Sequence, residues 1–92
     1  MNIYTIYDMK ANAYLTPFFL PTDGMATRTF SDCANDPKHQ FGAHPEDYIL
    51  WKIGTYDDAV GVITPLENHE ALGKAVEYVD PNAPHQIDIQ ES

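Results

Sequence analysis

The alternation of apolar and polar residues predicts strands at two places in the chain. Residues 3–7 are β-branched and aromatic, and the run stops at Asp8, which is typical of an opening strand. Residues 48–56 hold too many β-branched and aromatic side chains to favour a helix, so we expect a central strand. Its two faces hold Tyr48, Leu50 and Lys52, and Ile49, Trp51 and Ile53. One face of this strand is therefore fully apolar.

Between these two predicted strands, the apolar residues follow helical spacing instead of alternation. Thr22 or Asp23 can accept hydrogen bonds from the free amides of a first helical turn, and the residues that follow predict a helix of about three turns. The helix is expected to end at residues 35–36, because the residue before Pro37 is pushed out of the α region. The apolar residues expected on its buried face are Met25, Ala26, Phe30, Cys33 and Ala34.

Two prolines mark residues 10–22 as irregular or as a sheet edge, because a proline lacks the N–H that a strand ladder needs. Between the prolines lie the apolar residues Phe18, Phe19 and Leu20. These side chains must be covered, and two interpretations are open. They close over the core of the domain, or Phe18 and Phe19 form an exposed patch that meets a partner.

The chain after the central strand predicts a hairpin and then an ambiguous element. Residues 57–61 tolerate turn geometry, and residues 62–64 resume an extended pattern that Pro65 is expected to stop. The apolar spacing of residues 72–79 favours a helix over a last strand, although Gly73 weakens a helix.

These elements define an α+β domain with a small antiparallel sheet and one main helix packed on it. We expect a single domain over residues 1–80, because a chain of 92 residues fits one small domain. Residues 81–92 contain few apolar side chains, which predicts an extended or frayed tail. The core available to so short a chain is thin, and we therefore expect a homo-oligomer rather than a monomer.

The charge balance is strongly acidic. Five Lys and Arg side chains stand against 14 carboxylates, which gives a formal net charge of −9. Nucleic-acid affinity comes largely from Lys and Arg that displace counterions, so this balance is unfavourable for binding phosphates. No segment has the basic and apolar runs of a signal peptide or the roughly 20 apolar residues of a membrane span. We expect a cytoplasmic location and no membrane partner.

The sequence offers no catalytic or metal-binding motif. Four histidines and the single cysteine, Cys33, lack the closely spaced ligand pairs of zinc sites. The carboxylate pairs at residues 46–47 and 57–58 lie about 25 Å apart along the central strand at about 3.3 Å per residue, so turn and cap roles explain them better than one site. There is neither a nucleophile elbow nor a phosphate-binding glycine loop. We expect a protein that is not an enzyme and holds no cofactor or metal.

Aromatic residues provide the remaining binding signal. Several lie on the predicted strands, where unpaired bases can stack, although core packing is the competing interpretation. The candidate nucleic-acid-binding residues are the cations Lys10, Arg28, Lys38 and Lys52 with the aromatic residues Tyr48 and Trp51.

Three segments, residues 7–19, 28–35 and 44–61, together resemble a known phage family. The chain resembles the small nonstructural proteins of gokushovirus-type microviruses, which are tailless phages with circular single-stranded DNA genomes. The resemblance covers residues 4–61 and continues more loosely through Leu72. The stretches His-Pro-Glu-Asp-Tyr and Ile-Gly-Thr-Tyr-Asp-Asp are its most specific elements.

The resemblance implies a process rather than a set of catalytic residues. Such proteins are treated as equivalents of microvirus protein C, which favours single-strand synthesis coupled to packaging, and some are labelled DNA-binding. The implied role is a regulator or adaptor in the host bacterial cytoplasm that contacts phage or host replication and packaging proteins. Candidate partner-binding residues are Phe18, Phe19 and Leu20. The alternatives are a weak, non-sequence-specific single-stranded DNA-binding protein and an internal scaffolding component.

Overall fold

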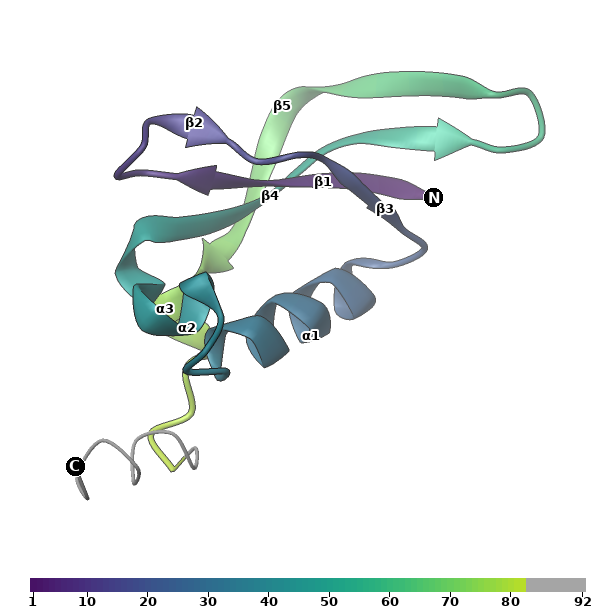
Figure 1. Cartoon of the computed structure of the whole chain (residues 1–92). Helices are drawn as coiled ribbons and strands as arrows, with labels where there is room; N and C mark the ends of the chain where they lie inside the picture. Colours follow the sequence, from purple (N-terminus) through teal and green to yellow (C-terminus); the bar gives the residue numbers. More distant parts are fainter. Residues whose placement is uncertain (83–92) are drawn as a thin grey trace.

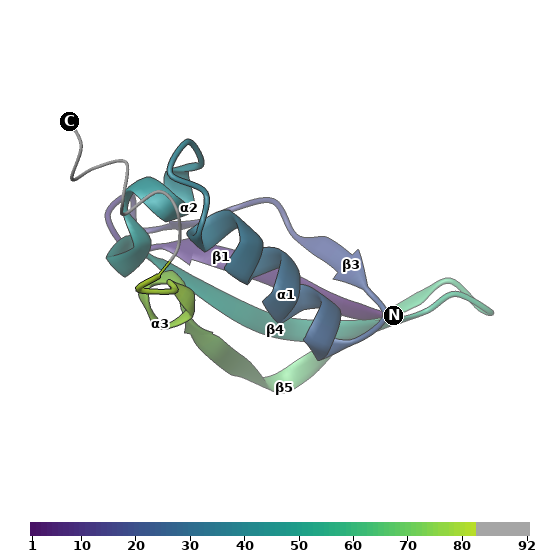
Figure 2. The ribbon, with the colours of Figure 1, turned by 90° about the horizontal axis from the view of Figure 1, so that it is seen from below.

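A five-stranded antiparallel sheet forms one layer of the molecule, and the helices pack against one of its faces (Figures 1 and 2). The computed structural model describes residues 1–82. The strands are β1 (Asn2–Asp8), β2 (Ala13–Tyr14), β3 (Phe18–Leu20), β4 (Tyr48–Asp57) and β5 (Val62–Lys74). The helices are α1 (Asp23–Ala34), α2 (Gln40–Ala43), the 3₁₀ turn η1 (Pro45–Asp47) and α3 (Ala75–Tyr78). The predicted α+β class is confirmed.

β1 and β4 form the middle of the sheet, whose order is β2-β1-β4-β5, and β3 also pairs with β1. Along β1, Asn2 lies opposite Thr55 and Asp8 lies opposite Tyr48. β2 and β3 pair with the two ends of β1 on the edge away from β4. Residues 10–22 therefore supply two short edge strands, as their prolines predict.

Helix α1 begins and ends where its capping residues predict. The Thr22 side chain accepts a 3.2 Å hydrogen bond from the Met25 amide, and Asn35 is the C-cap. Its buried residues, Ala26, Phe30 and Ala34, recur every four positions and face the sheet. The expectation for Met25 is wrong, because Met25 lies one position off this stripe and is 47% exposed.

The hairpin of β4 and β5 confirms the turn predicted at residues 57–61, in which Gly61 has a φ of 69°. The predicted stop at Pro65 is wrong, because β5 continues to Lys74. β5 is an edge strand, where a missing N–H need not break a ladder bond. The helix favoured for residues 72–79 shrinks to the single turn of α3, since Leu72 still belongs to β5.

The core lies between the sheet and α1, where Tyr4 and Leu50 are fully buried. Asn35 ties the C-terminal part of the described chain to this core. Its side-chain amide donates to the Tyr78 carbonyl over 2.9 Å, and its Oδ1 accepts from the Asp80 amide over 2.7 Å. The single-domain expectation for residues 1–80 stays a prediction, and most of the expected tail, residues 83–92, lies outside the described residues.

The molecule is elongated, with principal extents of 53 × 25 × 17 Å. Its radius of gyration is 14.7 Å, whereas a compact chain of this length has about 12 Å. The hairpin of β4 and β5, which runs past the end of β1, accounts for much of the excess (Figure 1). Within residues 1–82, no helix has the length and apolar character that crossing a membrane requires.

Candidate interaction surface

The face of the sheet turned away from the helices is the most distinctive surface of the molecule, and we call it the open face. In residues 1–82 all the helices lie on the opposite side (Figures 1 and 2). Side chains alternate along each strand, so the register places apolar and aromatic residues together here. The open face comprises Ile3, Thr5, Tyr7, Tyr14, Phe19, Ile49, Trp51, Ile53, Tyr56, Ile63, Pro65 and His69, together with Ala71 and Lys74, which pair with Trp51 and Ile49.

Strand β4 turns its fully apolar side outward. Tyr48 and Leu50 point into the core beneath the helices, and Lys52, two residues further on, reaches the first turn of α1. Ile49, Trp51 and Ile53 therefore occupy the open face, where they are half-buried. In an ordinary antiparallel sheet with one solvated face, the apolar side of each strand faces the core. In β4 the apolar side faces outward, and the side that also carries Lys52 faces the core. The pattern indicates a surface that another molecule covers.

Aromatic pairs reinforce the open face at both ends of β1. Tyr7 and Tyr14 have ring centroids 4.6 Å apart, and Phe19 and Tyr56 meet edge to face at 5.6 Å. Tyr14 and Phe19 are 58% and 41% exposed. The Trp51 indole Nε1 is buried and has no hydrogen-bond partner within residues 1–82. These rings present large apolar area without charge.

Two shallow hollows lie side by side on the open face and share Pro17, Ile53 and His69. The first measures about 250 Å³ and the second, nearer the hairpin, about 290 Å³. The remaining lining residues are Thr5, Tyr14 and Leu15 in the first hollow, and Ile3, Phe19, Gly54, Ile63 and Pro65 in the second. No Asp, Glu, Lys or Arg is among them. The hollows suit apolar side chains and offer no charged group to a ligand.

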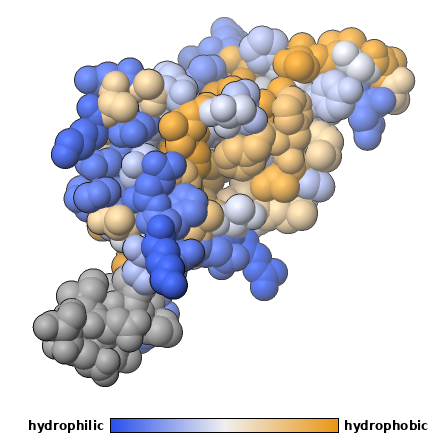
Figure 3. All heavy atoms as spheres, in the orientation of Figure 1, coloured by the Kyte–Doolittle hydropathy of each residue, from blue (hydrophilic) through white to orange (hydrophobic). Residues whose placement is uncertain are grey.

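The outer part of the hairpin, residues 56–63, forms a second feature that we call the arm. The last β1–β4 pair joins Asn2 to Thr55, and Met1 still exchanges two backbone hydrogen bonds with Tyr56. Beyond Tyr56, within the described residues, the arm has no third strand beside it. Val60, Val62 and Ile63 are 68%, 49% and 58% exposed. Figure 3 shows hydrophobic residues over the middle of the molecule and over the hairpin, where some hydrophilic residues also lie, and mostly hydrophilic residues at the opposite end. A bare two-stranded ribbon is marginally stable, so the arm is suited to pack on something else.

The structure disperses the candidate nucleic-acid-binding residues. Tyr48 is buried against Phe41, with ring centroids 4.6 Å apart, so its ring is not presented to a base. Lys52 lies on the helix side and pairs with Asp23 at 3.6 Å. Trp51 alone of the set lies on the open face, while exposed Lys10, Arg28 and Lys38 sit on the β1–β2 turn, on α1 and on the loop after α1. These six residues do not form one surface.

The three apolar residues of β3, Phe18–Leu20, do not all have the same role, since some cover the core and one is exposed. Phe18 stacks on Tyr4 with centroids 5.7 Å apart, and Leu20 also packs against the core. Phe19 points the other way, lines the hollow nearer the hairpin and is exposed. Phe18 and Leu20 close over the core, and Phe19 belongs to the candidate surface.

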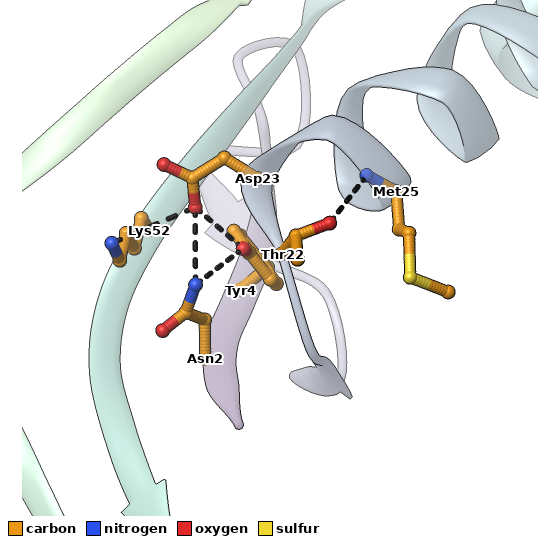
Figure 4. A network of polar contacts seen from close by, with 6 residues as sticks. All are labelled: Asn2, Tyr4, Thr22, Asp23, Met25 and Lys52. Atoms are coloured by element: carbon orange, nitrogen blue, oxygen red, sulfur yellow. Dashed lines mark hydrogen bonds and ion pairs between the residues drawn. The ribbon is translucent and has the colours of Figure 1, made fainter.

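A polar network joins the start of α1 to the sheet (Figure 4). The Tyr4 hydroxyl donates to Asp23 Oδ1 over 2.6 Å, and the Asn2 amide donates to the same oxygen over 3.3 Å. Burial, and then the bond to Asp23, raise the pKa of Tyr4 to about 12. Lys52 supplies the positive charge near this carboxylate. The network holds the helix on the sheet and carries no feature of a catalytic site.

The remaining chemically active groups occupy structural positions. Burial, with smaller effects of Asp32 and Asp36, raises the pKa of the Cys33 thiol, so the thiol stays protonated at neutral pH. Asp57 accepts from the Ala59 amide at 3.0 Å, the turn role predicted for it. At η1, His44, which precedes the turn, and Glu46 and Asp47 within it place one potential ligand atom each within 4.8 Å of one another. Exposed acidic groups often lie this close together without binding a metal ion, so the cluster alone does not define a metal site.

Several residues of the candidate surface were absent from the sequence-based site predictions. Ile63, Pro65 and His69 belong to β5, a strand expected to stop at Pro65. The alternation in residues 48–53 already separates Trp51 from Tyr48 and Lys52. That pattern was the available signal that the proposed aromatic and cationic residues do not share a face.

Comparison with known proteins places the chain in a phage family. Residues 1–78 match the family model described as Phage ORF5 protein. Because the match covers most of the chain, the protein belongs to this family, which makes it a small protein of phage origin. No curated protein and no solved structure matches the chain.

Proposed function

We propose that this protein is a non-enzymatic regulator or adaptor that favours single-stranded DNA synthesis and packaging in its phage, and that it acts through protein contacts. The observation that carries the proposal is the open face, an apolar surface with uncharged hollows on a chain of net charge −9. Large exposed apolar patches on small soluble proteins mark contact sites. Family membership supplies the phage context.

The geometry favours protein over nucleic acid as the principal partner. DNA binding requires several cations close to one another, and Lys52 is already paired with Asp23. The cations Lys10, Arg28 and Lys38 lie on separate segments away from the two hollows. An apolar partner surface needs no such charges. The expected partners are replication and packaging proteins of the phage or its host, in the host cytoplasm.

Co-purification tests the proposal. An affinity-tagged chain produced in infected host cells should recover at least one replication, capsid or packaging protein, identified by mass spectrometry. Ile63→Asp puts a charge on the open face and should abolish this recovery. Met25→Asp makes the same change at an exposed site on α1 and should leave recovery intact. Recovery of no such protein by the wild-type chain would overturn the proposal.

A weak single-stranded DNA-binding function is the second candidate, and the aromatic residues of the open face favour it. Tyr7, Tyr14 and Trp51 present π-faces on which unpaired bases can stack. Titration of Trp51 fluorescence with oligonucleotides at low and moderate salt separates the candidates. The protein-contact proposal predicts no quenching, whereas DNA binding requires quenching that weakens as salt rises. An internal scaffolding role would instead place the protein in assembly intermediates.

A further inference from the structure

The open face and the arm together form a surface that lacks a partner within the described chain. The arm places apolar side chains on both of its faces, because the adjacent residues Val62 and Ile63 point to opposite sides of the ribbon. The open face beside it is hollowed around Ile53 and Phe19. One molecule therefore carries both an apolar projection and apolar hollows.

The absence of Asp, Glu, Lys and Arg from the lining of the two hollows limits which kind of molecule can bind there. A nucleic acid would require cations, and the residues that line the hollows include none. A basic protein would be drawn to carboxylates, which are also absent there. The surface that matches the two hollows is itself apolar, and the exposed apolar side chains of another copy, such as Val60 and Ile63 of its arm, meet that description. Two chains of charge −9 can meet this way, since salt screens carboxylates that lie more than about 8 Å away.

The available area is large enough for a stable dimer. Six large apolar side chains on the open face, the arm and the adjoining N-terminus are 41–68% exposed, namely Met1, Tyr14, Phe19, Val60, Val62 and Ile63. With half-buried Trp51, Ile53 and Tyr56 they offer on the order of 600–800 Å² per chain, on a scale where one aromatic side chain contributes 150–250 Å². Stable interfaces bury about 800 Å² per partner.

We propose that a second copy of this chain covers the open face in a two-fold symmetric dimer, with the arm of each copy lying across the open face of the other. Such an interface is isologous, so the same patch must be complementary to itself, and a projection beside a hollow provides that complementarity. The inference rests on the proposed function because it concerns the same surface, so a phage protein that binds the open face competes with the second copy for it. The dimer buries the apolar side chains of the open face.

Sedimentation of the full-length chain tests the dimer. At about 0.15 M salt, the wild-type chain and Met25→Asp should both sediment with twice the 10.4 kDa mass of one chain at micromolar concentration. Ile63→Asp buries two uncompensated charges in the symmetric interface and should weaken the dimer by at least about 100-fold. Val60→Asp, at the exposed tip of the arm, provides a second variant whose site bears no core packing. Circular dichroism of every variant verifies folding.

The outcomes separate this inference from the proposed function. A wild-type chain that is monomeric up to about 200 µM overturns the dimer, as does a folded pair of Ile63→Asp and Val60→Asp variants that dimerise like the wild type. A chain that is monomeric but still recovers phage proteins from infected cells contradicts the dimer and supports the adaptor function. A dimer that recovers only itself supports the inference and overturns the adaptor function.

Discussion

The hydroxyl of Tyr4 donates a 2.6 Å hydrogen bond to Asp23 Oδ1, and this bond joins the first strand of the sheet to the first turn of α1. Tyr4 is fully buried, so its hydroxyl depends on this partner and on Asn2. Asp23 lies beside Thr22, the N-cap residue, and its carboxylate also meets Lys52 of the central strand. One carboxylate therefore adds polar contacts to the apolar packing that holds the helix on the sheet.

Removal of the Tyr4 hydroxyl should lower stability. Tyr4→Phe keeps the packing of the ring and leaves Asp23 without its shortest hydrogen bond, which should cost about 1–2 kcal/mol of unfolding free energy because Asp23 is partly exposed. Urea denaturation measures the difference. Tyr14→Phe removes a hydroxyl from a largely exposed ring and should change stability by less than about 0.5 kcal/mol. Equal effects of the two substitutions would show that the bond to Asp23 contributes nothing.

The contribution of Tyr4 should disappear at alkaline pH. Burial and the bond to Asp23 raise the pKa of Tyr4 from 10.0 to about 12, so folding favours the neutral phenol. Because the pKa of Tyr4 is higher in the folded state than in the unfolded state, the neutral phenol stabilises the fold. This stabilisation is fully present below pH 10 and is lost as pH rises through about 12. The stability advantage of the wild type over Tyr4→Phe should therefore shrink between about pH 10 and about pH 12. An advantage that stays constant over this window would contradict the assignment.

Asn35 should control the order of the chain after α3. Asn35→Ala removes the donor to the Tyr78 carbonyl and the acceptor for the Asp80 amide, and should cost about 1–3 kcal/mol. Amide hydrogen exchange should accelerate at Asp80. Asn35→Asp retains an acceptor for the Asp80 amide and loses the hydrogen bonds that Asn35 donates to the Ser31 and Tyr78 carbonyls, so it should protect Asp80 without restoring full stability. Unchanged exchange at Asp80 in Asn35→Ala would show that the hydrogen bond from the Asp80 amide to Asn35 does not order this segment.

Gly73 should resist substitution. Its φ of 126° is rarely adopted by side-chain-bearing residues, and a Cβ there would lie 3.0 Å from the Tyr78 ring. Gly73→Ala should destabilise the protein by about 1–3 kcal/mol. Gly24→Ala is the matched control, because it lies in the first turn of α1 with space for a methyl group, and it should be neutral or mildly stabilising. Thermal unfolding of both variants measures the contrast.

Local signals were sufficient to predict much of the fold. The cap at Thr22, the turn at residues 57–61 and the alternation in residues 48–56 each depend on neighbouring residues, and α1 and β4 formed as predicted. The continuation of β5 past Pro65 depends on its place at the sheet edge, which no local pattern reveals. Met25 was misplaced for a related reason, since only the packing of α1 determines its buried stripe.

The candidate surface was harder to predict, because whether an apolar strand side is core or binding surface depends on which molecule covers it. The apolar side of residues 49–53 was recognised, but the pattern alone does not tell whether the chain's own helices or another molecule covers it. Here the helices pack on the side that carries Tyr48 and Leu50, which leaves Trp51 and Ile53 outside the core. Phe19 follows the same logic, because it alternates with core residues on both sides.

The central claim is that the open face makes the protein contacts of this phage protein, and hydroxyl-radical labelling tests it most directly. Labelling is compared between the dilute isolated chain and the complex co-purified from infected cells. The account predicts that Tyr14 and Phe19 lose most of their labelling in the complex, while Met25, on the helix side, keeps its own. Unchanged labelling of Tyr14 and Phe19, with protection of Met25 instead, would contradict it.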